Sequence, residues 1–344
     1  MANLSSQQKQ IVFAEESKII VLAAAGSGKT RCIAERLKYL LESGSDPERV
    51  VAITFTNMAA EEIYERVGHP KGLFVGTIHS YANYLLLSAG ISTHQYLDDE
   101  EFDVLFEEVK AHPECIKPVD HLLLDESQDS NEQQFEFILD MINPKNYMLV
   151  GDFRQSIYRF NGARPDIILS MVKEPDIKVY TLDENYRCGS KIIDFARRII
   201  RLCGSDYEDR SIPARQVGGN VYEMEYNIPK IINLVKDKTA YNEWFVLART
   251  NAQVNAIANA FTKAGIPNET FKKAQLTNNE LKRRIKENTV KIITIHTAKG
   301  LEAPNVIVVG AQFYNLEEKC ISYVAATRAR NTLIWTKTPR KKYF

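Results

Sequence analysis

The sequence predicts an α/β protein built from two parallel sheets, each covered by helices. Short apolar segments alternate with helical patterns along the chain: Ile19–Ala23 precedes Arg31–Leu41, and Val50–Phe55 precedes Met58–Val67. Strands that are apolar along their whole length are typical of parallel sheets buried on both faces. The other expected strands are His121–Leu124, Tyr147–Val150, Val179–Leu182, Trp244–Leu247, Val290–Ile295, Val306–Val309 and Thr332–Thr336.

The distribution of charge divides the chain into two halves. Its 344 residues carry 44 Lys+Arg and 44 Asp+Glu, so the formal net charge is zero. Residues 1–180 have 17 basic and 28 acidic side chains (net −11), whereas residues 181–344 have 27 and 16 (net +11). A chain of this length is typical of about two domains. We therefore expect a boundary near residue 180, between an acidic and a basic domain.

Composition excludes several protein classes. With 44% hydrophobic and 26% charged residues, the chain is not a disordered or low-complexity sequence. Its five cysteines show no C-x-x-C spacing, which argues against a disulfide framework or a zinc site and fits a reducing compartment. The N-terminus lacks the apolar core of a signal peptide, and no apolar run approaches the roughly 20 residues that span a bilayer. We expect a soluble intracellular protein.

A glycine-rich turn between an expected strand and an expected helix is the strongest local motif. It reads Ala23-Ala-Ala-Gly-Ser-Gly-Lys29-Thr30, close to G-x-x-x-x-G-K-[ST] with Ala23 in place of the first glycine. Backbone N–H groups in such a loop cradle phosphates, Lys29 reaches the β- and γ-phosphates, and Thr30 holds Mg²⁺. The motif predicts a site for a nucleoside triphosphate.

Two further strand ends carry polar groups suited to this chemistry. The strand His121–Leu124 ends in Asp125 and Glu126, which we expect to order Mg²⁺ and to polarise the attacking water, respectively. Alone, the two acids could equally cap the next helix. Gln155 follows another strand and could touch the γ-phosphate, although a lone glutamine in a turn is usually only solvated. The acidic stretch Asp98–Glu108 is interpreted as a solvated amphipathic helix.

These motifs belong to a longer series with a known order. In the acidic half the series comprises Leu4–Gln8, Ala23–Arg31, Thr54–Glu61, Gly76–Ser80, Leu124–Asp129 and Gly151–Tyr158. In the basic half it comprises Glu184–Arg187, Leu247–Gln253, Thr294–Glu302 and Tyr323–Ala329. The chain resembles superfamily 1 DNA helicases of the UvrD/Rep/PcrA type, whose motifs Q, I, Ia, Ib, II and III, then IV, IVa, V and VI, run in this order.

The resemblance implies two RecA-like domains with ATP in the cleft between them. Residues 1–180 would form domain 1A, with 81–120 as a reduced 1B-like insertion, and residues 181–344 would form domain 2A. By similarity, Gln8 and Tyr186 contact adenine, Glu302 contacts the ribose, and Arg187 and Arg328 reach the γ-phosphate. The full implied ATP set is Gln8, Ala23, Ala24, Ala25, Gly26, Ser27, Gly28, Lys29, Thr30, Arg31, Tyr186, Arg187, Gly300, Glu302 and Arg328, with Mg²⁺ at Thr30 and Asp125.

The resemblance also implies a path for single-stranded DNA. Aromatic side chains that stack on bases would be Phe55, Tyr158 and Phe160, because single-strand grooves combine positive charge with aromatic platforms. Polar support would come from Thr56, Asn57, His79 and His296. The implied function is that of an ATP-dependent DNA helicase or single-strand translocase with 3′→5′ polarity. Its substrate would be single-stranded or tailed duplex DNA in a bacterial cytoplasm, with the gene belonging to the bacterium or to a phage; no membrane partner is expected.

The chain departs from the family pattern in two ways. Relatives usually have Trp at the position of Phe160 and Arg at the position of Asn161. The lack of this arginine puts in doubt how motif III, Gly151–Tyr158, couples to ATP hydrolysis here. About 40 residues separate Ser80 from His121, and fewer than 25 separate Pro267 from Val290, where relatives insert subdomains 1B and 2B. The basic run Lys282–Lys286 lies at the second place and could touch phosphates or simply be solvated.

Three functional hypotheses therefore stay open. The first is a complete helicase, and the second is a motor subunit that translocates but unwinds poorly unless a protein partner replaces 2B. The third is a nucleotide-gated adaptor that binds DNA and barely hydrolyses ATP. The presence of Glu126, Gln155, Arg187 and Arg328 argues against the third.

Overall fold

The structure is a computed structural model that describes residues 4–98, 102–204, 207–214, 218–272, 275–311 and 313–337. It forms two compact units, each with its own six-stranded sheet. The first unit comprises Met1–Ala23 and Gly28–Leu182, and the second comprises Ala24–Ser27 and Asp183–Phe344.

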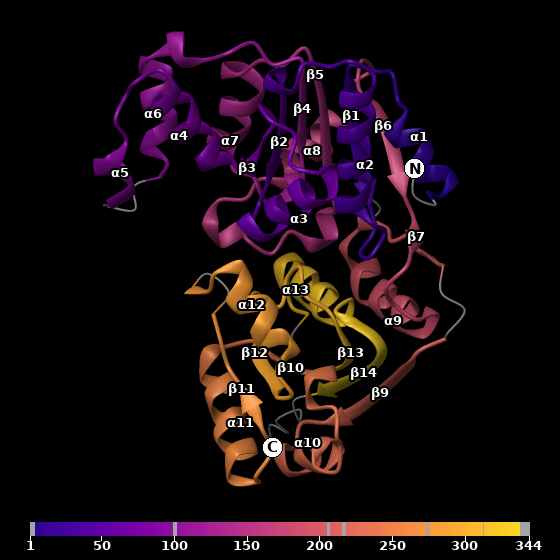
Figure 1. Ribbon diagram of the computed structural model, residues 1–344. Coiled ribbons are helices and arrows are strands. Elements are labelled where there is room, and N and C mark those ends of the chain that lie inside the picture. The colour runs from indigo at the N-terminus through magenta and orange to yellow at the C-terminus, as the bar shows by residue number, and fades with distance from the viewer. Residues whose placement is uncertain are drawn as a thin grey trace. The chain divides into compact units, whose positions relative to one another are not determined.

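The sheet of the first unit is parallel throughout, with strand order β3-β2-β4-β5-β1-β6 (Figure 1). Its strands are β1 (Lys18–Ala23), β2 (Val50–Thr54), β3 (Phe74–Thr77), β4 (His121–Leu124), β5 (Asn146–Gly151) and β6 (Lys178–Leu182). Because all of these strands run the same way, the loops that follow them emerge at one edge of the sheet. The expected phosphate, carboxylate and aromatic residues of the first half follow β1, β2, β4 and β5 at that edge.

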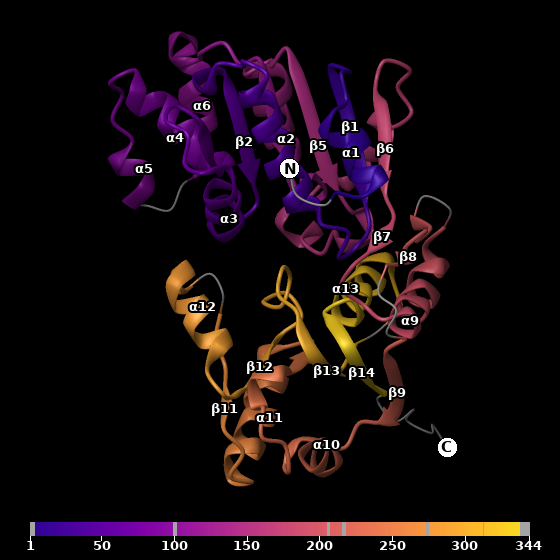
Figure 2. The ribbon, with the colours of Figure 1, turned by 45° about the vertical axis from the view of Figure 1, so that its right-hand side comes forward.

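Helices cover both faces of this sheet. Ile19 and Val21 of β1 pack in one core cluster with residues of α1, α2 and α3, whereas Ile20 between them is equally buried on the opposite face. Helices α4, α5 and α6 extend beyond the β3 edge (Figures 1 and 2). The helices are α1 (Ser6–Val12), α2 (Lys29–Glu42), α3 (Asn57–Val67), α4 (Ile78–Ser88), α5 (His94–Asp98), α6 (Val104–Ala111), α7 (Glu132–Phe135) and α8 (Pro165–Met171). Shorter helical turns are η1 (Pro47–Arg49), η2 (Pro113–Cys115), η3 (Ser127–Asp129), the π-helical η4 (Glu136–Met141), η5 (Phe153–Gln155) and η6 (Arg159–Asn161).

The second unit repeats the architecture with strand order β11-β12-β10-β13-β14-β9, again parallel (Figure 2). Ile334 of β14 packs in the core with α10 and α11, and the next residue, Trp335, contacts Phe195 of α9. Since successive strand residues face opposite ways, helices cover both faces. The strands are β9 (Asn220–Glu225), β10 (Trp244–Ala248), β11 (Asn268–Glu269), β12 (Val290–Thr294), β13 (Ala303–Val309) and β14 (Ala329–Lys337), and β7 (Glu184–Asn185) pairs with β8 (Ile212–Pro213). The helices are α9 (Ser190–Ile200), α10 (Ile228–Val235), α11 (Asn251–Lys263), α12 (Asn278–Lys286) and α13 (Leu316–Ala326), with short turns η7 (Arg201–Cys203) and η9 (Tyr241–Glu243).

The α/β class and the parallel sheets are confirmed, and each expected strand is present. The sequence did not predict the edge strands β3, β9 and β11 or the two-residue strands β7 and β8. Strand β3 contains Gly76, β9 is mostly solvent-exposed and carries two glutamates, and β7, β8 and β11 have only two residues each, so none has the apolar run by which the other strands were found. In the acidic stretch, helix α6 begins at Val104 and buries Leu105 and Phe106, while residues 99–101 lie outside the described residues. Within the described part of the chain, no helix is both long and apolar enough to cross a membrane.

Candidate functional site

The phosphate-binding motif lies where β1 ends and α2 begins. Gly28 immediately precedes α2 with a φ of +83°, a conformation that L-residues rarely adopt. A Cβ atom there would also lie 3.0 Å from the Gln8 side-chain nitrogen, so a larger residue would in addition displace that side chain slightly. Ala23, by contrast, is the buried last residue of β1 and pairs with Leu182 of β6. A position inside a regular strand does not need glycine, which explains the alanine there.

Lys29 and Thr30, in the first turn of α2, meet the two carboxylates that follow β4. The Lys29 ammonium is 3.6 Å from Glu126 Oε1, and the Thr30 hydroxyl donates to Asp125 Oδ2 at 3.3 Å. The side chain of Lys29 is 10% exposed and that of Glu126 is 26% exposed. The structure thus brings together two pairs of residues, Thr30 with Asp125 and Lys29 with Glu126, that lie 95 and 97 positions apart in the sequence.

Asp125 is buried, and its environment disfavours its charged form. Burial and the neighbouring Glu126 carboxylate raise the pKa of Asp125, although Lys29, the Glu126 N–H and Thr30 act against this shift. The Thr30 hydroxyl and the Asp125 carboxylate can each supply an oxygen ligand to a metal ion. They lie side by side where an additional positive charge would be stabilising. Such oxygen donors are the ligand type that Mg²⁺ prefers, so these residues fit that metal.

Glu126 is held in an unusual backbone conformation. Its φ is +52°, in the left-handed region that costs a non-glycine residue on the order of 1 kcal/mol. Its N–H donates to Asp125 Oδ1 at 2.9 Å, and one of its side-chain oxygens accepts from Gln128 Nε2 at 2.6 Å. The strained turn thereby fixes both carboxylates in one arrangement.

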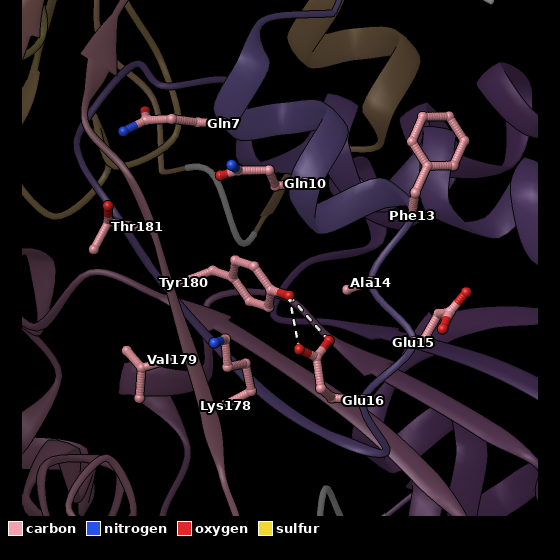
Figure 3. A pocket seen from close by; sticks show the side chains of 10 residues that line it. All are labelled: Gln7, Gln10, Phe13, Ala14, Glu15, Glu16, Lys178, Val179, Tyr180 and Thr181. Carbon is pink, nitrogen blue, oxygen red and sulfur yellow. Dashed lines mark hydrogen bonds between the residues drawn. The ribbon is translucent and has the colours of Figure 1, made fainter.

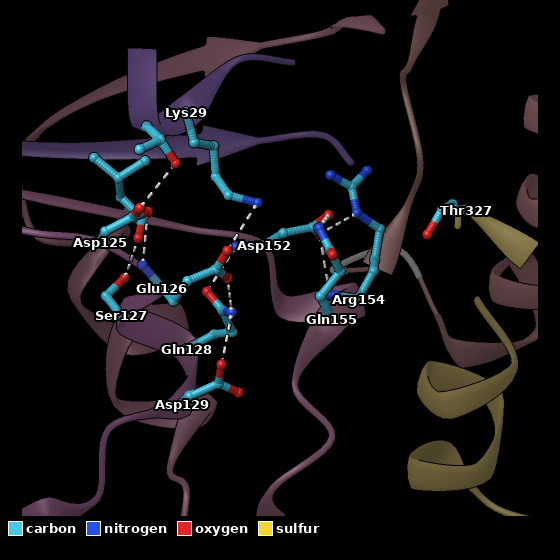
Figure 4. Close-up of polar contacts among 12 residues, drawn as sticks. Lys29, Asp125, Glu126, Ser127, Gln128, Asp129, Asp152, Arg154, Gln155 and Thr327 are labelled. Carbon is cyan, nitrogen blue, oxygen red and sulfur yellow. Dashed lines mark hydrogen bonds and ion pairs between the residues drawn. The ribbon is translucent and has the colours of Figure 1, made fainter. Parts of the chain in front are cut away.

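Gln155 lies in the same polar network (Figure 4). It is 3% exposed, and its side-chain amide donates to Asp152 Oδ2 at 2.8 Å. The backbone N–H of Asp152 in turn donates to Gln128 Oε1 at 2.9 Å. Gln155 is thus a buried, hydrogen-bonded residue connected to Glu126 through Gln128, not the solvated turn residue that its local sequence suggested.

Gln8 is fixed by a capping box at the start of α1. Ser5 and Gln8 bond reciprocally, with the Gln8 N–H donating to the Ser5 hydroxyl and the Ser5 N–H donating to Gln8 Oε1. Gln8 is only 2% exposed, and its side-chain nitrogen lies beside Gly28. The structure therefore places Gln8 against the phosphate-binding turn. Arg31 lies in α2, two residues after Lys29 and half-buried.

The three expected stacking residues lie together at the same sheet edge. Phe55 follows β2, and its ring stacks on that of Tyr158 with a centroid distance of 5.1 Å and an interplanar angle of 25°. The ring centroids of Phe160 and Tyr158 are 6.1 Å apart; Phe160 is 64% exposed and Phe55 40%, whereas Tyr158 is half-buried. These three residues are called the aromatic stack below. They form a continuous platform with one strongly exposed member.

The polar residues assigned to DNA differ in their surroundings. Thr56 caps α3, accepting from the Ala59 N–H at 3.3 Å, and Asn57 is the exposed first residue of that helix. His79 bonds Asp103 at 3.0 Å and stacks on Phe106, so it already has partners within the first unit. His296 is half-buried in the turn after β12, in the second unit.

In the second unit, Arg187 forms an ion pair with Glu302. The Arg187 Nε donates to Glu302 Oε2, its Nη1 lies 3.4 Å from the Thr327 carbonyl, and Arg330 approaches the other Glu302 oxygen at 3.7 Å. Burial alone would raise the pKa of Glu302, but the nearby arginines outweigh it and lower the pKa. Glu302 therefore stays ionised between two guanidinium groups.

The other expected residues of this unit are distributed around that pair. Arg328 is 1% exposed and donates to the carbonyls of Val324 (3.0 Å) and Leu301 (3.3 Å). Tyr186 is 45% exposed, its hydroxyl bonds Glu184, and its N–H donates to the Gly26 carbonyl at 2.9 Å, since Ala24–Ser27 belongs to this unit. Gly300 has a φ of +81° in the turn before Glu302.

A separate hollow of about 710 Å³ lies between α1 and the edge strand β6 (Figure 3). Its lining includes Gln7, Phe13 and Tyr180, and the Tyr180 hydroxyl donates to Glu16. None of the residues expected to bind nucleotide or DNA lines it. The functional residues thus follow the strand ends and not this hollow.

Comparison with known proteins decides the family. The model of the UvrD/REP helicase N-terminal domain matches residues 4–105 and 91–176, and that of the UvrD-like helicase C-terminal domain matches residues 180–276 and 268–340. The chain belongs to the UvrD/Rep helicase family. It is 26% identical over 367 aligned positions to the ATP-dependent DNA helicase PcrA of Staphylococcus epidermidis, covering 77% of this chain and 50% of that protein. It is also 26% identical to a probable DNA helicase II homolog of Mycoplasma capricolum, covering 72% and 49%.

The chain spans about half the length of the curated relatives it matches. Among the described residues, the segment 81–120 of this UvrD-family chain holds most of α4 together with α5, α6 and the turn η2, whereas the segment 268–289 holds β11 and α12.

Two residues of this UvrD-family site were missed by sequence reasoning. Gln128 lies inside the motif Leu124–Asp129, where the sequence alone assigns it no role. The pattern that could have pointed to it is an apolar strand that ends in a run of polar residues. Arg36, on α2, is 5% exposed, and its Nη1 donates to the carbonyls of Ile11, Val12 and Ala14 at 3.1, 3.0 and 2.8 Å. Arg36 thereby ties the end of α1, which carries Gln8, to the phosphate-binding helix. A single arginine in an amphipathic helix gives no sequence signal for this role.

Proposed function

We propose that this chain is an ATP-driven motor that moves along single-stranded DNA in the 3′→5′ direction and separates strands. The observation that supports the proposal most is the joint arrangement in the first unit. The Lys29–Glu126 and Thr30–Asp125 pairs lie at the same sheet edge as the aromatic stack. One unit thus holds groups for phosphoryl transfer and groups for base stacking on loops of one rigid sheet.

We assign the binding of the triphosphate and the activation of water as follows. The loop Ala23–Thr30 and Arg31 bind the triphosphate, with Lys29 on its β- and γ-phosphates, and Gln8 reads the adenine edge. Glu126 orients and deprotonates the attacking water, since its carboxylate is partly exposed while Asp125 is buried. Gln155 senses the γ-phosphate.

Thr30 and Asp125 would hold Mg²⁺. When bound, the metal neutralises charge on the phosphate oxygens. The chain itself contributes two oxygen donors that are already within 3.3 Å of each other. Because Asp125 must be ionised to act as a ligand, the raised pKa in the absence of a cation predicts that metal binding displaces a proton.

To the second unit we assign the groups that complete the reaction. Arg187 and Arg328 neutralise charge on the γ-phosphate as it is transferred, Tyr186 stacks on adenine, and Glu302 with Gly300 contacts the ribose. In this assignment residues 1–180 form domain 1A, carrying motifs Q, I, Ia, Ib, II and III, and residues 181–344 form domain 2A, carrying motifs IV, IVa, V and VI. An arginine supplied in this way can contribute about 10³–10⁵ in rate.

Single-stranded DNA would stack on Phe55, Tyr158 and Phe160, with Thr56, Asn57, His79 and His296 as polar contacts. Each stacked base contributes about 1–3 kcal/mol to binding. Both relatives described above come from bacteria, and we place the protein in a bacterial cytoplasm, encoded by the bacterium or by a phage.

The decisive experiment measures steady-state ATP hydrolysis with and without single-stranded DNA, next to a Lys29→Ala control. We expect DNA to stimulate hydrolysis and the control to abolish it. Duplexes with a 3′ or a 5′ single-stranded tail then test strand separation and its direction. ATP binding without multiple turnovers would instead favour a nucleotide-gated adaptor.

A second candidate function is a motor subunit that translocates but unwinds poorly alone. The short segments 81–120 and 268–289 favour it: we assign the first as a reduced 1B-like insertion, and the described residues of the second contain only β11 and α12 as regular elements. Strong DNA-stimulated hydrolysis with weak unwinding of tailed duplexes would support this candidate, as would rescue of unwinding by a partner that replaces 2B.

A further inference from the structure

Gln128 connects the loop that carries Glu126 to the loop that leads to the aromatic stack. Its side chain is fully buried, and both ends of its amide are used. The Nε2 atom donates to Glu126 Oε2 (2.6 Å) and Asp129 Oδ2 (3.2 Å), while Oε1 accepts the backbone N–H of Asp152 (2.9 Å), as Figure 4 shows. A single side chain therefore joins the ends of β4 and β5.

Further hydrogen bonds join the loop after β4 to the loop after β5. The Ser127 hydroxyl donates to the Val150 carbonyl at 3.0 Å, and the Ser156 hydroxyl donates to the Gln128 carbonyl at 3.2 Å. At Gly151 a Cβ atom would lie 2.7 Å from both Gln128 Oε1 and Ser127 Oγ, so only glycine permits this approach. The loop after β5 is thus joined to the loop after β4 by several direct contacts.

The loop after β5 continues directly into the aromatic stack. Asp152 holds Gln155 through its carboxylate, and the Gln155 N–H donates to the Asp152 carbonyl at 2.8 Å. Ser156 and Ile157, the next two residues, are both completely buried, and Tyr158 follows them with its ring against Phe55. The segment that connects the Tyr158 ring to Asp152 is thus short and largely buried.

We propose that Gln128 is a positioning residue that couples occupancy of the aromatic stack by single-stranded DNA to the placement of Glu126. This inference rests on the proposed function. The chemistry explains why a glutamine is used. A neutral amide donates and accepts at once, whereas a glutamate would bring a third carboxylate next to Glu126 and Asp129 and would lose the donor. The hydrogen bonds through Gln128 also supply a route for coupling DNA binding to hydrolysis that does not need an arginine at position 161, which is Asn161 here.

The test uses the full chain with Gln128→Met, which preserves side-chain volume, and Gln128→Glu, which keeps the acceptor for the Asp152 N–H. Hydrolysis is measured at saturating ATP with and without a saturating thymidine oligonucleotide. We expect the ratio of DNA-stimulated to basal turnover to fall about tenfold in both variants, in the range of ordinary allosteric coupling. Gln133→Ala, at a glutamine of α7 that bonds Glu107 at the surface, should leave the ratio unchanged.

A binding measurement separates coupling from a merely structural role. Because coupling is reciprocal, a non-hydrolysable ATP analogue should change the oligonucleotide Kd of the wild-type chain but not that of the Gln128 variants. Equal losses of basal and stimulated turnover, or an unchanged ratio, would overturn the inference while leaving the proposed function intact. Wild-type turnover that does not respond to DNA would instead contradict the proposed function and, with it, this inference.

Discussion

The two units share one architecture but hold their charged groups in different ways. Each has a six-stranded parallel sheet covered on both faces. In the first unit, the ends of β1 and β4 bring Lys29 and Thr30 against Glu126 and Asp125. In the second unit the corresponding cationic groups are arginines, and Arg187 pairs with Glu302 while Arg328 is held by backbone carbonyls.

This difference shows where function resides in such a molecule. The sheets provide equivalent scaffolds, and the loops after their strands decide which chemistry each can support. The first unit has Lys29, Thr30 and the two carboxylates, so we expect it to bind the phosphates and the metal. The second holds Ala24–Ser27 of the phosphate-binding turn and offers guanidinium groups, which suits stabilisation of charge that develops during the reaction.

The largest effect that tests this contrast is expected at Arg187. Replacement with alanine should lower kcat about 10³-fold while changing the Kd for ATP much less, because a transition-state contact is lost. Rapid-quench and steady-state kinetics measure both quantities. Arg330→Ala is the matched control, since Arg330 also pairs with Glu302 but is 48% exposed against 18% for Arg187.

We expect Arg330→Ala to stay within about threefold of the wild-type kcat, as for an ordinary surface ion pair. If the two variants lose activity equally, Glu302 and its partners act only as a structural cluster. The assignment of Arg187 to the γ-phosphate would then be wrong, and the second unit would lose its proposed chemical role.

A second test compares the buried basic residues that hold each unit together. In the second unit, Lys291 is completely buried and bonds Glu269 (3.2 Å), the Glu287 carbonyl (2.9 Å) and Thr289 (2.5 Å). Lys291→Met should lower the free energy of unfolding of this unit by about 3 kcal/mol, because it removes one partner of a buried ion pair. Tryptophan fluorescence in urea reports on it selectively, since both tryptophans, Trp244 and Trp335, lie in the second unit.

The counterpart in the first unit is Arg36→Met. It removes the donor to three carbonyls at the end of α1 and should destabilise that unit by about 3 kcal/mol, the cost of leaving buried acceptors unpaired. Far-UV circular dichroism should show an earlier transition, while tryptophan fluorescence should keep its wild-type midpoint. Coincident transitions in both probes would mean that the units unfold as one and that this contrast in stability does not exist.

The fold and part of the site could be predicted from the sequence for a definite reason. Apolar runs such as Ile19–Ala23 and His121–Leu124 reveal buried parallel strands, and parallel strands bring their following loops to one edge. Lys29, Asp125, Gln155 and the aromatic stack therefore all follow strands at the same edge of the first sheet. Their functional roles stay predictions until the experiments above are done.

The remaining contacts depend on packing that no local pattern encodes. The bonds of Arg36 to the end of α1 connect residues 22 to 25 positions apart, and the ion pair of Arg187 with Glu302 spans 115 positions. The relay through Gln128 requires knowing that β4 and β5 are neighbours and that Gly151 permits close approach. The edge strands β3, β9 and β11 were missed because they lack the apolar run that made the edge strand β6 recognisable.

The smallest expected effect concerns how the first unit binds DNA. Phe160 is the most exposed member of the aromatic stack, and Phe160→Ala should weaken binding of a thymidine oligonucleotide by about 1–2 kcal/mol, roughly 5- to 30-fold, through loss of one stacked base. Tyr314→Ala removes an even more exposed ring (72%) from the second unit, at a position with no assigned role, and should leave the Kd unchanged. Fluorescence anisotropy at fixed salt measures both. Since alanine at Phe160 removes no charge, the salt dependence of binding should keep its slope while the affinity falls. A changed slope, or equal losses in the two variants, would mean that the exposed rings act non-specifically and that the stack of the first unit is not the platform for bases.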